Sequence, residues 1–551
     1  MRDYRQICDE FRWELPQDCN MAADVCLRHA EDDVALIHPR DSGEPETWHF
    51  GDFARESAKL ANALSGLGMK FGARLAVLMG QRPETATSHL AAWRGGMISV
   101  PLFILFGPDA LTYRLSHSGA ETVITDRAGL ARLAEADLSE SEVARIIAVD
   151  ADKDGVQNGI PVLSWRKLLE SASDSQTPAA TTPDTPALVI YTSGTTGAPK
   201  GAVHGHRVLR GHLPGVCLPH NFFPQKDDCF WTPADWAWIG GLLDVLMPSW
   251  FYGVPVVSYR AAKFDPEQAM FFMAKHRVRN VFMPPTALRL MRAADAKPPG
   301  DLTLRSIGSG GETLGAEMLE WGRATFGTDI NEFYGQTECN LIIGNCAELS
   351  TPRAGMMGRA IPGHRIAAID EDGQPLPDGE EGEVAAHRGG ANGDGDPVMF
   401  LGYWRNSKAT AKKFRGSWLC TGDRARRDKD GFWTFVGRDD DVISSGGYRI
   451  GPGEIEDCLT SHPSVSLAGV VGVEDDIRGQ VIKAVVVPSS SAKPGDDLAE
   501  ALRIHVKTRL AAHESPRIIV FAESLPLTAT GKIKRAELRS QHRAETGQNG
   551  D

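Results

Sequence analysis

The stretch Tyr191–Gly201 reads YTSGTTGAPKG and directly follows Ala187–Ile190, an apolar run typical of a buried strand. Its three glycines allow a ligand to approach the backbone closely, while its hydroxyl groups and Lys200 supply donors and a positive charge. Successive N–H groups in a loop of this kind form a concave site for anions. The stretch therefore predicts a polyphosphate-binding loop at the end of a strand.

This loop differs from the Walker A phosphate loop, in which serine or threonine follows the lysine. Here Lys200 is preceded by Pro199 and followed by Gly201. A solvated surface loop is the alternative, because serine, threonine and glycine are common in such loops. The order of the eleven residues favours the phosphate-binding interpretation.

Helical and strand-like segments alternate on both sides of this loop. Upstream, the helical spacing of Asp52–Leu67 precedes a strand-like run at Arg74–Met79. Such alternation is typical of a parallel sheet covered by helices. The polar loop Ser171–Pro186 interrupts the pattern, which resumes at Ala187 and continues past Gly327. The other upstream segments expected are a helix at Pro83–Gly95, a strand at Met97–Phe103, a helix at Ala110–Ser118 and a strand at Thr122–Thr125.

The pattern changes in the C-terminal third of the chain. From about Gly358 to Trp433–Val436, short alternating strands predict antiparallel or barrel-like β structure. After Asp441, new helical and strand-like segments predict a small separate α+β domain. The expected fold class is α/β, with a large N-terminal domain of two parallel-sheet α/β subdomains plus a β-barrel-like subdomain, followed by the small domain. The small domain is expected to contain helices near Glu454–Leu459 and Asp497–His513, and strands near Leu467–Val473, Val481–Val487 and Arg517–Phe521.

Composition and charge exclude several classes of protein. The 551 residues carry 59 Lys and Arg against 72 Asp and Glu, so a net charge of −13 disfavours non-specific binding to nucleic acid or anionic membranes. A hydrophobic content of 42% excludes a mostly disordered chain. The nine cysteines include no CxxC pair, which disfavours a disulfide framework or a structural zinc site. The charged N-terminus lacks a secretory pattern and the apolar stretch 241–257 is short for a membrane span, so we expect a soluble, cytoplasmic protein.

Further motifs follow the loop along the chain. Tyr334–Glu338 (YGQTE) holds an aromatic ring, hydrogen-bonding groups and a carboxylate, and a carboxylate beside a triphosphate suits Mg²⁺. Together with the loop, these motifs resemble those of the adenylate-forming (AMP-binding) superfamily, in its acyl-CoA synthetase branch. The chain looks most like the medium-chain acyl-CoA synthetases. The remaining motifs are GGET at Gly310–Thr313, TGD at Thr421–Asp423, GRDDD at Gly437–Asp441, SGGYRI at Ser445–Ile450 and TGKIKR at Thr530–Arg535.

The resemblance implies an ATP site built from these motifs. Tyr334 would pack on adenine, Thr337 would contact the α-phosphate, and Glu338 would serve as the Mg²⁺ ligand. Asp423, at the end of a strand, would take the ribose hydroxyls, and Arg438 would contact the ribose as well. The other residues expected at the nucleotide are Thr192, Ser193, Gly194, Thr195, Thr196, Gly197, Lys200, Gly311, Glu312, Thr313 and Arg449.

The resemblance also implies a reaction in two steps with a domain rotation between them. Residues 1–438 would form the large domain, and residues 439–551 would form a small domain that rotates about a hinge at Asp440. Lys532 would bridge the substrate carboxylate and the α-phosphate in the first step, because a cation must offset the repulsion of two anions. After rotation, Gly447 would lie along the tunnel for the pantetheine arm of coenzyme A.

Glycines mark the expected acyl pocket. By resemblance to short-chain synthetases, Ile239, Gly240, Gly310 and Gly335 would line this pocket, with Trp238 in the same segment. Relatives specific for acetate carry a tryptophan where Gly335 stands, so we expect Gly335 to leave a void. Each buried methylene contributes about 0.8 kcal/mol, so a roomy apolar pocket should prefer acids larger than acetate.

The resulting hypothesis is an AMP-forming acyl-CoA ligase. A carboxylic acid and MgATP would give an acyl-adenylate and pyrophosphate, and the thiol of coenzyme A would then release AMP. The expected acid is medium-chain or branched, and an aromatic acid is an alternative. A freestanding adenylation enzyme that loads a carrier-protein thiol is a second alternative. A non-enzymatic ATP-binding protein is disfavoured because Lys532, Glu338 and Asp423 are all present.

Overall fold

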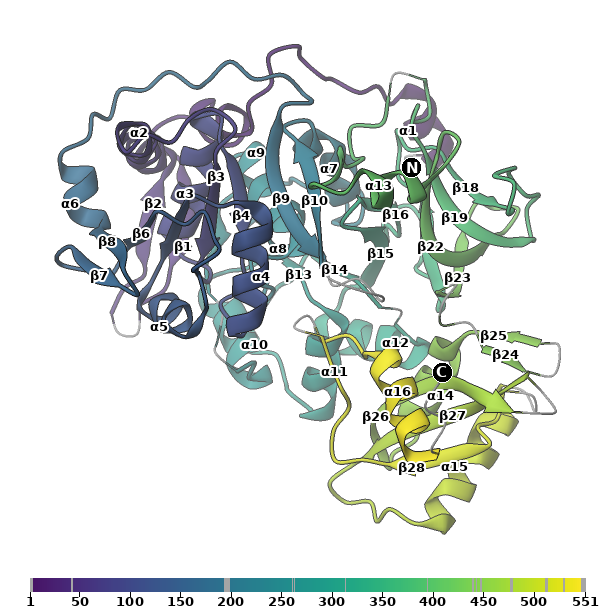
Figure 1. Cartoon of the computed structure of the whole chain (residues 1–551). Coiled ribbons are helices and arrows are strands. Elements are labelled where there is room, and N and C mark those ends of the chain that lie inside the picture. The colour runs from purple at the N-terminus through teal and green to yellow at the C-terminus, as the bar shows by residue number, and fades with distance from the viewer. Residues whose placement is uncertain are drawn as a thin grey trace.

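Three sheets organise the chain (Figure 1). The structure is a computed structural model, and it describes residues 3–40, 43–192, 199–259, 261, 263–312, 314–393, 395–438, 441, 443–445, 448–475, 479–510, 514–528 and 531–546. Among these residues, none of the helices combines the length and apolarity that crossing a membrane requires. All nine cysteines are free thiols.

The first sheet has nine strands in the order β20-β10-β9-β4-β3-β5-β6-β8-β7. Its central strands run parallel and are almost entirely buried, which explains their continuous apolar sequences. The strands are β3 (Arg74–Leu78), β4 (Ile98–Pro101), β5 (Thr122–Thr125), β6 (Arg145–Ala148), β7 (Gly155–Gln157), β8 (Ile160–Ser164), β9 (Pro186–Thr192), β10 (Lys200–Gly205) and β20 (Gly402–Tyr403). The accompanying helices are α2 (Phe50–Gly66), α3 (Pro83–Arg94), α4 (Pro108–Ser118), α5 (Arg127–Glu135) and α6 (Trp165–Glu170).

The second sheet has fourteen strands, on the path β18-β19-β22-β23-β17-β16-β15-β14-β13-β11-β12-β1-β2, with β21 paired to β22. The segment from β1 to β15 is parallel, and the strands from β16 onward are antiparallel. The strands expected to form a barrel-like subdomain therefore continue the second parallel sheet, because β17 hydrogen-bonds to β16. Figure 1 shows this continuation in green beside the teal parallel strands.

The bounds of these elements follow the apolar segments of the sequence. The strands are β1 (Val34–His38), β2 (Glu46–His49), β11 (Phe230–Trp231), β12 (Val256–Val257), β13 (Asn280–Phe282), β14 (Ser306–Gly310), β15 (Ile330–Gln336), β16 (Cys339–Gly344), β17 (Met356–Ala360), β18 (Ile366–Ile369), β19 (Glu381–His387), β21 (Phe414–Arg415), β22 (Trp418–Arg427) and β23 (Trp433–Arg438). The helices are α1 (Tyr4–Glu10), α7 (Val208–Cys217), α8 (Ile239–Gly241), α9 (Met247–Phe251), α10 (Pro266–Lys275), α11 (Pro285–Ala293), α12 (Ala316–Phe326) and α13 (Ser407–Lys412), with π-helical turns at Ala23–Leu27 and Leu242–Leu246.

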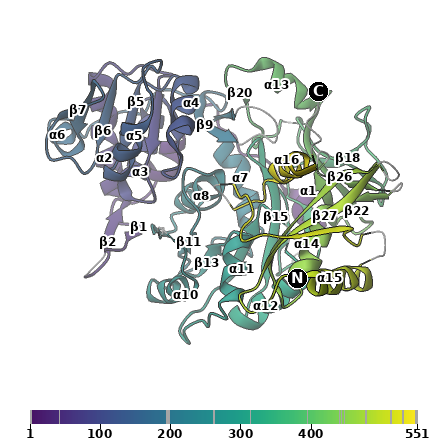
Figure 2. The same cartoon turned by 60° about the horizontal axis from the view of Figure 1, so that its bottom comes forward.

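A five-stranded sheet forms the C-terminal α+β unit, which has hydrophobic clusters of its own. Arg509, the last residue of its α15, pairs with Glu317 near the start of α12 of the large unit at 3.4 Å, and Figure 2 shows the C-terminal unit on the same side of the molecule as α11 and α12. The elements are β24 (Ile443–Ser445), β25 (Tyr448–Ile450), α14 (Pro452–Thr460), β26 (Val465–Asp475), β27 (Gly479–Pro488), α15 (Asp496–Arg509), β28 (Ile518–Phe521) and α16 (Arg535–Thr546).

The residues at its two ends determine where α4 begins and ends. Pro108 occupies its first turn, where a missing N–H costs no hydrogen bond. Gly119 ends the helix with φ of 66°, a left-handed conformation that favours glycine. Leu111 and Leu115, four residues apart, fix the helix to the first sheet through one buried face.

Candidate active site

The glycine-rich stretch joins two antiparallel strands of the first sheet. Thr192 ends β9 and lies opposite Lys200, the first residue of β10, and the Thr192 hydroxyl donates to the Lys200 carbonyl at 3.4 Å. The stretch thus follows a buried strand, as the sequence indicated, and the second strand, β10, that begins at Lys200 was not foreseen. The expected ligand contacts at Ser193, Gly194, Thr195, Thr196 and Gly197 lie outside the described residues.

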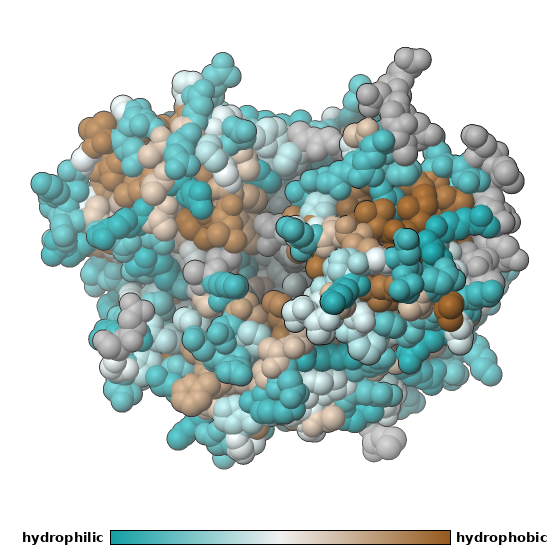
Figure 3. Space-filling view, turned by 90° about the horizontal axis from the view of Figure 1, so that it is seen from below, coloured by the Kyte–Doolittle hydropathy of each residue, from teal (hydrophilic) through white to brown (hydrophobic). Residues whose placement is uncertain are grey.

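A cavity of about 1220 Å³ lies between the large unit and the C-terminal unit. The view from below shows this face hollowed at its centre, with apolar residues on both sides of the hollow (Figure 3). The structure brings many of the expected site residues to this one cavity, although they come from distant parts of the chain. They are Thr192, Lys200, Trp238, Gly311, Glu312, Tyr334, Gly335, Thr337, Glu338, Asp423, Arg438 and Lys532.

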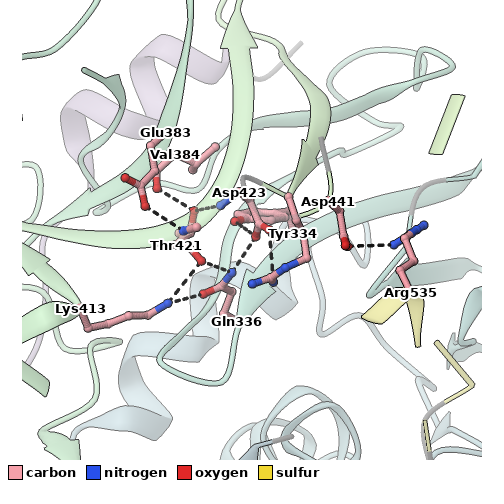
Figure 4. Close-up of polar contacts among 11 residues, drawn as sticks. Tyr334, Gln336, Glu383, Val384, Lys413, Thr421, Asp423, Asp441 and Arg535 are labelled. Atoms are coloured by element: carbon pink, nitrogen blue, oxygen red, sulfur yellow. Dashed lines mark hydrogen bonds and ion pairs between the residues drawn. The ribbon is translucent and has the colours of Figure 1, made fainter. Parts of the chain in front are cut away.

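Asp423, on β22, is the centre of a polar network (Figure 4). Its Oδ2 accepts hydrogen bonds from the Tyr334 hydroxyl and the Gln336 amide, both at 2.6 Å. Its Oδ1 faces Arg438 Nη1 at 3.4 Å. Burial and the Asp423 carboxylate raise the pKa of Tyr334 well above its ordinary value, so the phenol keeps its proton and donates. The network fixes the carboxylate on the cavity wall.

Lys413 and Gln336 extend this network, and sequence analysis missed both. The Lys413 ammonium donates to Gln336 Oε1 at 3.1 Å and to the Thr421 carbonyl at 3.3 Å, as Figure 4 shows. The Gln336 amide also donates to the Thr421 carbonyl at 2.8 Å. Gln336 lies inside the YGQTE motif, which was a usable signal. Lys413 had none, because only the pairing of β21 with β22 brings it to the site.

Glu338 is a buried carboxylate on the cavity wall and accepts a hydrogen bond from the Tyr403 hydroxyl. Lys200 Nζ lies 5.4 Å from the centre of the Tyr403 ring, which places a cation near the same corner. Among the described residues, no group of three or more His, Cys, Asp or Glu side chains could hold a metal. A lone carboxylate such as Glu338 would suit Mg²⁺ that phosphate oxygens and water hold for the most part.

Gly311 and Lys532 meet across the cavity. Gly311 follows β14 and has φ of +106°, a conformation that glycine adopts without strain. A Cβ at Gly311 would lie 3.8 Å from Lys532 Nζ. Desolvation by the surrounding protein lowers the pKa of Lys532 from its ordinary value. The carboxylates of Glu312 and Asp423 act in the opposite direction, because they favour the charged ammonium. The Lys532 side chain itself remains exposed at the cavity wall.

A half-buried ion-pair network follows Lys532 in the C-terminal unit. Arg535 binds the Glu456 carboxylate with two hydrogen bonds of 2.5 and 3.0 Å, and its Nη1 lies 3.4 Å from Asp441 (Figure 4). Arg539 adds a bond of 2.9 Å to Asp441. Bidentate contacts of this kind restrict the geometry of both partners. The network therefore ties the segment after Lys532 to the first residues of the C-terminal unit.

The expected void at Gly335 is absent. A Cβ at Gly335 would lie 2.2 Å from the backbone nitrogen of Leu341, because the β15–β16 hairpin folds back on itself there. A Cβ at Gly310 would meet the Phe333 ring at 2.5 Å, and one at Gly240 would meet the Trp238 ring at 2.7 Å. The inference that three glycines leave room for a long acid is therefore wrong, since all three glycines allow close packing.

Trp238 reaches the cavity wall, whereas its neighbour Ile239 is buried in the main hydrophobic core. Phe333 lines the cavity as well, and its ring packs on Phe282, which in turn packs on Trp238. Trp238 and Phe333 thus form an apolar part of the cavity wall, and the buried Phe282 packs behind them.

Four further positions were expected at the site from sequence. Thr313, Asp440 and Gly447 lie outside the described residues, and for Arg449 the structure describes only the backbone, in β25. Their roles stay predictions.

Glu332 is a further buried carboxyl on the cavity wall that sequence analysis missed. Its Oε1 accepts a hydrogen bond from the Leu314 backbone at 2.7 Å, and its Oε2 has no hydrogen-bond partner. Desolvation raises the pKa of Glu332 to about 8, so the group is largely protonated at pH 7. Two histidines that follow the glycine-rich stretch are buried and neutral. Burial lowers the pKa of His204 to about 3 and the pKa of His206 to about 4.

Comparison with known proteins gives matches over nearly the whole chain. The family model described as "AMP-binding enzyme" matches residues 23–404, and the model described as "AMP-binding enzyme C-terminal domain" matches residues 454–532. The human protein described as acyl-coenzyme A synthetase ACSM4, mitochondrial, is 34% identical over 540 residues, which cover 96% of this chain and 91% of that protein.

Two solved structures are similar as well. The crystal structure of an acyl-CoA synthetase from Brucella canis is 32% identical, with a TM-score of 0.74 over 99% of this chain and 100% of that chain. The crystal structure of an anthranilate CoA ligase in complex with anthranoyl-AMP is 26% identical, with a TM-score of 0.86 over 97% of this chain and 99% of that chain.

Proposed function

Because the chain belongs to the AMP-binding enzyme family and is an AMP-forming acyl-CoA synthetase, we propose that its cavity joins an apolar carboxylic acid larger than acetate to coenzyme A. The membership confirms the family resemblance and the α/β fold class. The single observation that carries the proposal is the placement of Lys532, Gly311, Glu338 and Asp423 around one cavity.

In the first step, ATP binds with its ribose at Asp423 and its adenine beside Tyr334. The hydrogen bonds from Tyr334 and Gln336 hold the Asp423 carboxylate in place for the ribose hydroxyls. The phosphates extend toward Thr192, Lys200 and the loop between them. Mg²⁺, when bound at Glu338, supplies positive charge to the phosphates.

The acid lies against the apolar wall of Trp238 and Phe333, with its carboxylate toward Thr337 and Lys532. A carboxylate oxygen forms a bond to the α-phosphorus, and the bond from this phosphorus to the pyrophosphate oxygen breaks. Lys532 offsets the repulsion between the two anions, and its position beside Gly311 supports this role. Positioning supplies the remaining catalysis, so no side chain acts as a nucleophile.

In the second step, residues 439–551 rotate about Asp440 relative to residues 1–438, and Gly447 replaces Lys532 at the cavity. The thiolate of coenzyme A then attacks the acyl carbonyl and AMP leaves. Rotation of this kind excludes water from the adenylate during the first step and admits the thiol during the second.

An aromatic acid is a second candidate substrate. The cavity wall of Trp238 and Phe333, with Phe282 packed behind both rings, offers aromatic surface to which a planar acid can pack. The relative solved with anthranoyl-AMP supports the same candidate.

A thioester-formation assay tests the proposal. Purified full-length protein is supplied with ATP, Mg²⁺ and coenzyme A, and with acids from acetate to about twelve carbons plus benzoate-type acids. We expect kcat/KM to rise from acetate to longer or aromatic acids. A preference for acetate would contradict the proposed acid class. Pyrophosphate release that requires a carrier protein in place of coenzyme A would contradict the proposed thiol.

A further inference from the structure

Arg114, on α4, is a buried arginine whose hydrogen-bonding capacity is largely unused. Its side chain lines the cavity although the residue is only 6% exposed. Its Nη1 donates to the Ala110 carbonyl of the same helix at 2.9 Å, and its Nε has no hydrogen-bond partner. The guanidinium lies 3.9 Å from the centre of the Phe106 ring and 5.7 Å from the centre of the Tyr191 ring. No carboxylate among the described residues pairs with it.

Arg94 shows how this chain satisfies a buried arginine that has a structural role. It is 4% exposed, and all three of its guanidinium nitrogens donate to protein oxygens at 2.6–3.2 Å. Its acceptors belong to Ala54, Ser57 and Gln176, and Arg94 does not line the cavity. Burial lowers the pKa of both arginines, because both charged groups are desolvated. Arg114 bears this cost without the matching set of hydrogen bonds.

The position of Arg114 indicates which ligand would supply the missing acceptors. Tyr191, whose ring lies near this guanidinium, is the next-to-last residue of β9 and the first residue of the glycine-rich stretch. Tyr113, the residue before Arg114 on α4, donates from its hydroxyl to the carbonyl of Pro199, near the other end of that stretch, at 2.9 Å. Helix α4 thus contacts both ends of the stretch that is expected to hold the phosphates, and Arg114 lies at the Tyr191 end.

We propose that Arg114 binds the β- and γ-phosphate oxygens of ATP and stabilises pyrophosphate as it leaves. This inference rests on the proposed ATP site. When the bond between the α-phosphorus and the bridging oxygen breaks, the electron pair stays on pyrophosphate. A desolvated guanidinium offers that group two parallel N–H donors and a positive charge, which suit phosphate geometry. AMP lacks these phosphates, so Arg114 discriminates ATP and pyrophosphate from AMP.

Binding measurements on the full-length protein test this assignment. Calorimetric titration gives the Kd of ATP, pyrophosphate and AMP, each with Mg²⁺ present, for the unmodified protein and for Arg114→Met, Arg114→Lys and Arg94→Met. For Arg114→Met we expect Kd for ATP and pyrophosphate to rise about tenfold to a hundredfold, the usual effect of removing a charge-assisted hydrogen bond. Kd for AMP should change less than about twofold.

The two other variants separate binding from structure. Arg114→Lys should recover part of the pyrophosphate affinity, because it restores the charge without the planar donors. Arg94→Met should lower the melting temperature and leave the ratio of the ATP and AMP affinities unchanged.

Three results would overturn the assignment. In the first, Arg114→Met weakens the affinities for AMP and ATP by the same factor. In the second, this variant binds pyrophosphate as tightly as the unmodified protein does. In the third, the variant loses affinity only for the acid or for coenzyme A. If the unmodified protein bound neither ATP nor pyrophosphate, the proposed function itself would fail, so the two failures are distinguishable.

Discussion

Lys532 Nζ lies 3.8 Å from the position that a Cβ on Gly311 would occupy, although Lys532 belongs to the C-terminal unit and Gly311 to the large unit. Both residues line the cavity, and Lys532 lies beside the turn after β14. The proposed first step calls for a lysine at this side of the cavity.

Lys532→Ala should slow acyl-adenylate formation by about two to three orders of magnitude, because the cation at the reacting anions is lost. Conversion of supplied acyl-adenylate to thioester should persist. Rapid-quench measurement of each half-reaction checks this, with Lys507→Ala, an exposed lysine on α15, as the control. Equal losses in both half-reactions would contradict a role confined to the first.

Gly335→Ala should destabilise the protein rather than change its chain-length preference. The new Cβ would meet the Leu341 backbone nitrogen at 2.2 Å, and overpacking of this kind costs about 1–3 kcal/mol or more. Denaturant unfolding measures the loss, with Gly300→Ala as a control because its Cβ would meet no atom within 4 Å. An unchanged stability together with a shifted acid preference would restore the pocket hypothesis.

Gly240→Ala is the substitution that should affect acid selection. Its Cβ would contact the Trp238 ring at 2.7 Å and the Phe282 ring at 2.9 Å, and rings can shift where backbone cannot. Because Trp238 lines the cavity, its displacement should lower kcat/KM for long acids relative to short ones by about tenfold. Steady-state kinetics with an acid series tests this. If kcat/KM fell by the same factor for all acids, Trp238 would have no role in selecting the acid.

Tyr334→Phe should weaken AMP and ATP together. The change removes the hydrogen bond of 2.6 Å to Asp423 but keeps the ring, so the affinity of both nucleotides should fall about threefold to tenfold. KM for the acid should stay constant. Tyr4→Phe is a suitable control, since the Tyr4 hydroxyl donates to the Ala360 carbonyl and Tyr4 does not line the cavity. Unchanged AMP affinity in Tyr334→Phe would show that Asp423 needs no such support.

Glu332 should make stability depend on pH. Its pKa is raised from 4.5 to about 8, so between these values the native state keeps a proton that the unfolded state has lost. The free energy of unfolding should fall as pH rises through this window, by up to roughly 1.4 kcal/mol per pH unit from this group. The stability that the protonated Glu332 contributes is fully present below pH 4.5 and is lost as the pH rises to about 8 and above.

Glu332→Gln isolates this effect, since its Oε1 can still accept from the Leu314 backbone. Denaturant unfolding from pH 5 to pH 9 should show a flatter pH dependence and a more stable protein near pH 8. Parallel stability curves for the two proteins would refute the raised pKa.

Local sequence determined most of the elements and the identity of the nucleotide motifs. The expected strand at Thr122–Thr125 coincides with β5, and the expected helix at Pro83–Gly95 differs from α3 by one residue. Apolar periodicity and capping residues act over a few neighbours, so a single sequence contains them in full. The same holds for the order of the phosphate loop and the YGQTE motif, which sufficed to indicate the family.

Tertiary structure alone decided what surrounds each motif. The fold of the β15–β16 hairpin sets the Leu341 backbone against Gly335 and removes the expected void. Packing of segments far apart in the chain brings Lys413 to Gln336, and only the packing of α4 shows that Arg114 lacks the acceptors that Arg94 has. Such contacts depend on strand register and on side-chain burial between segments far apart in the chain. No local pattern contains that information, because one change of register would give every one of these side chains different neighbours.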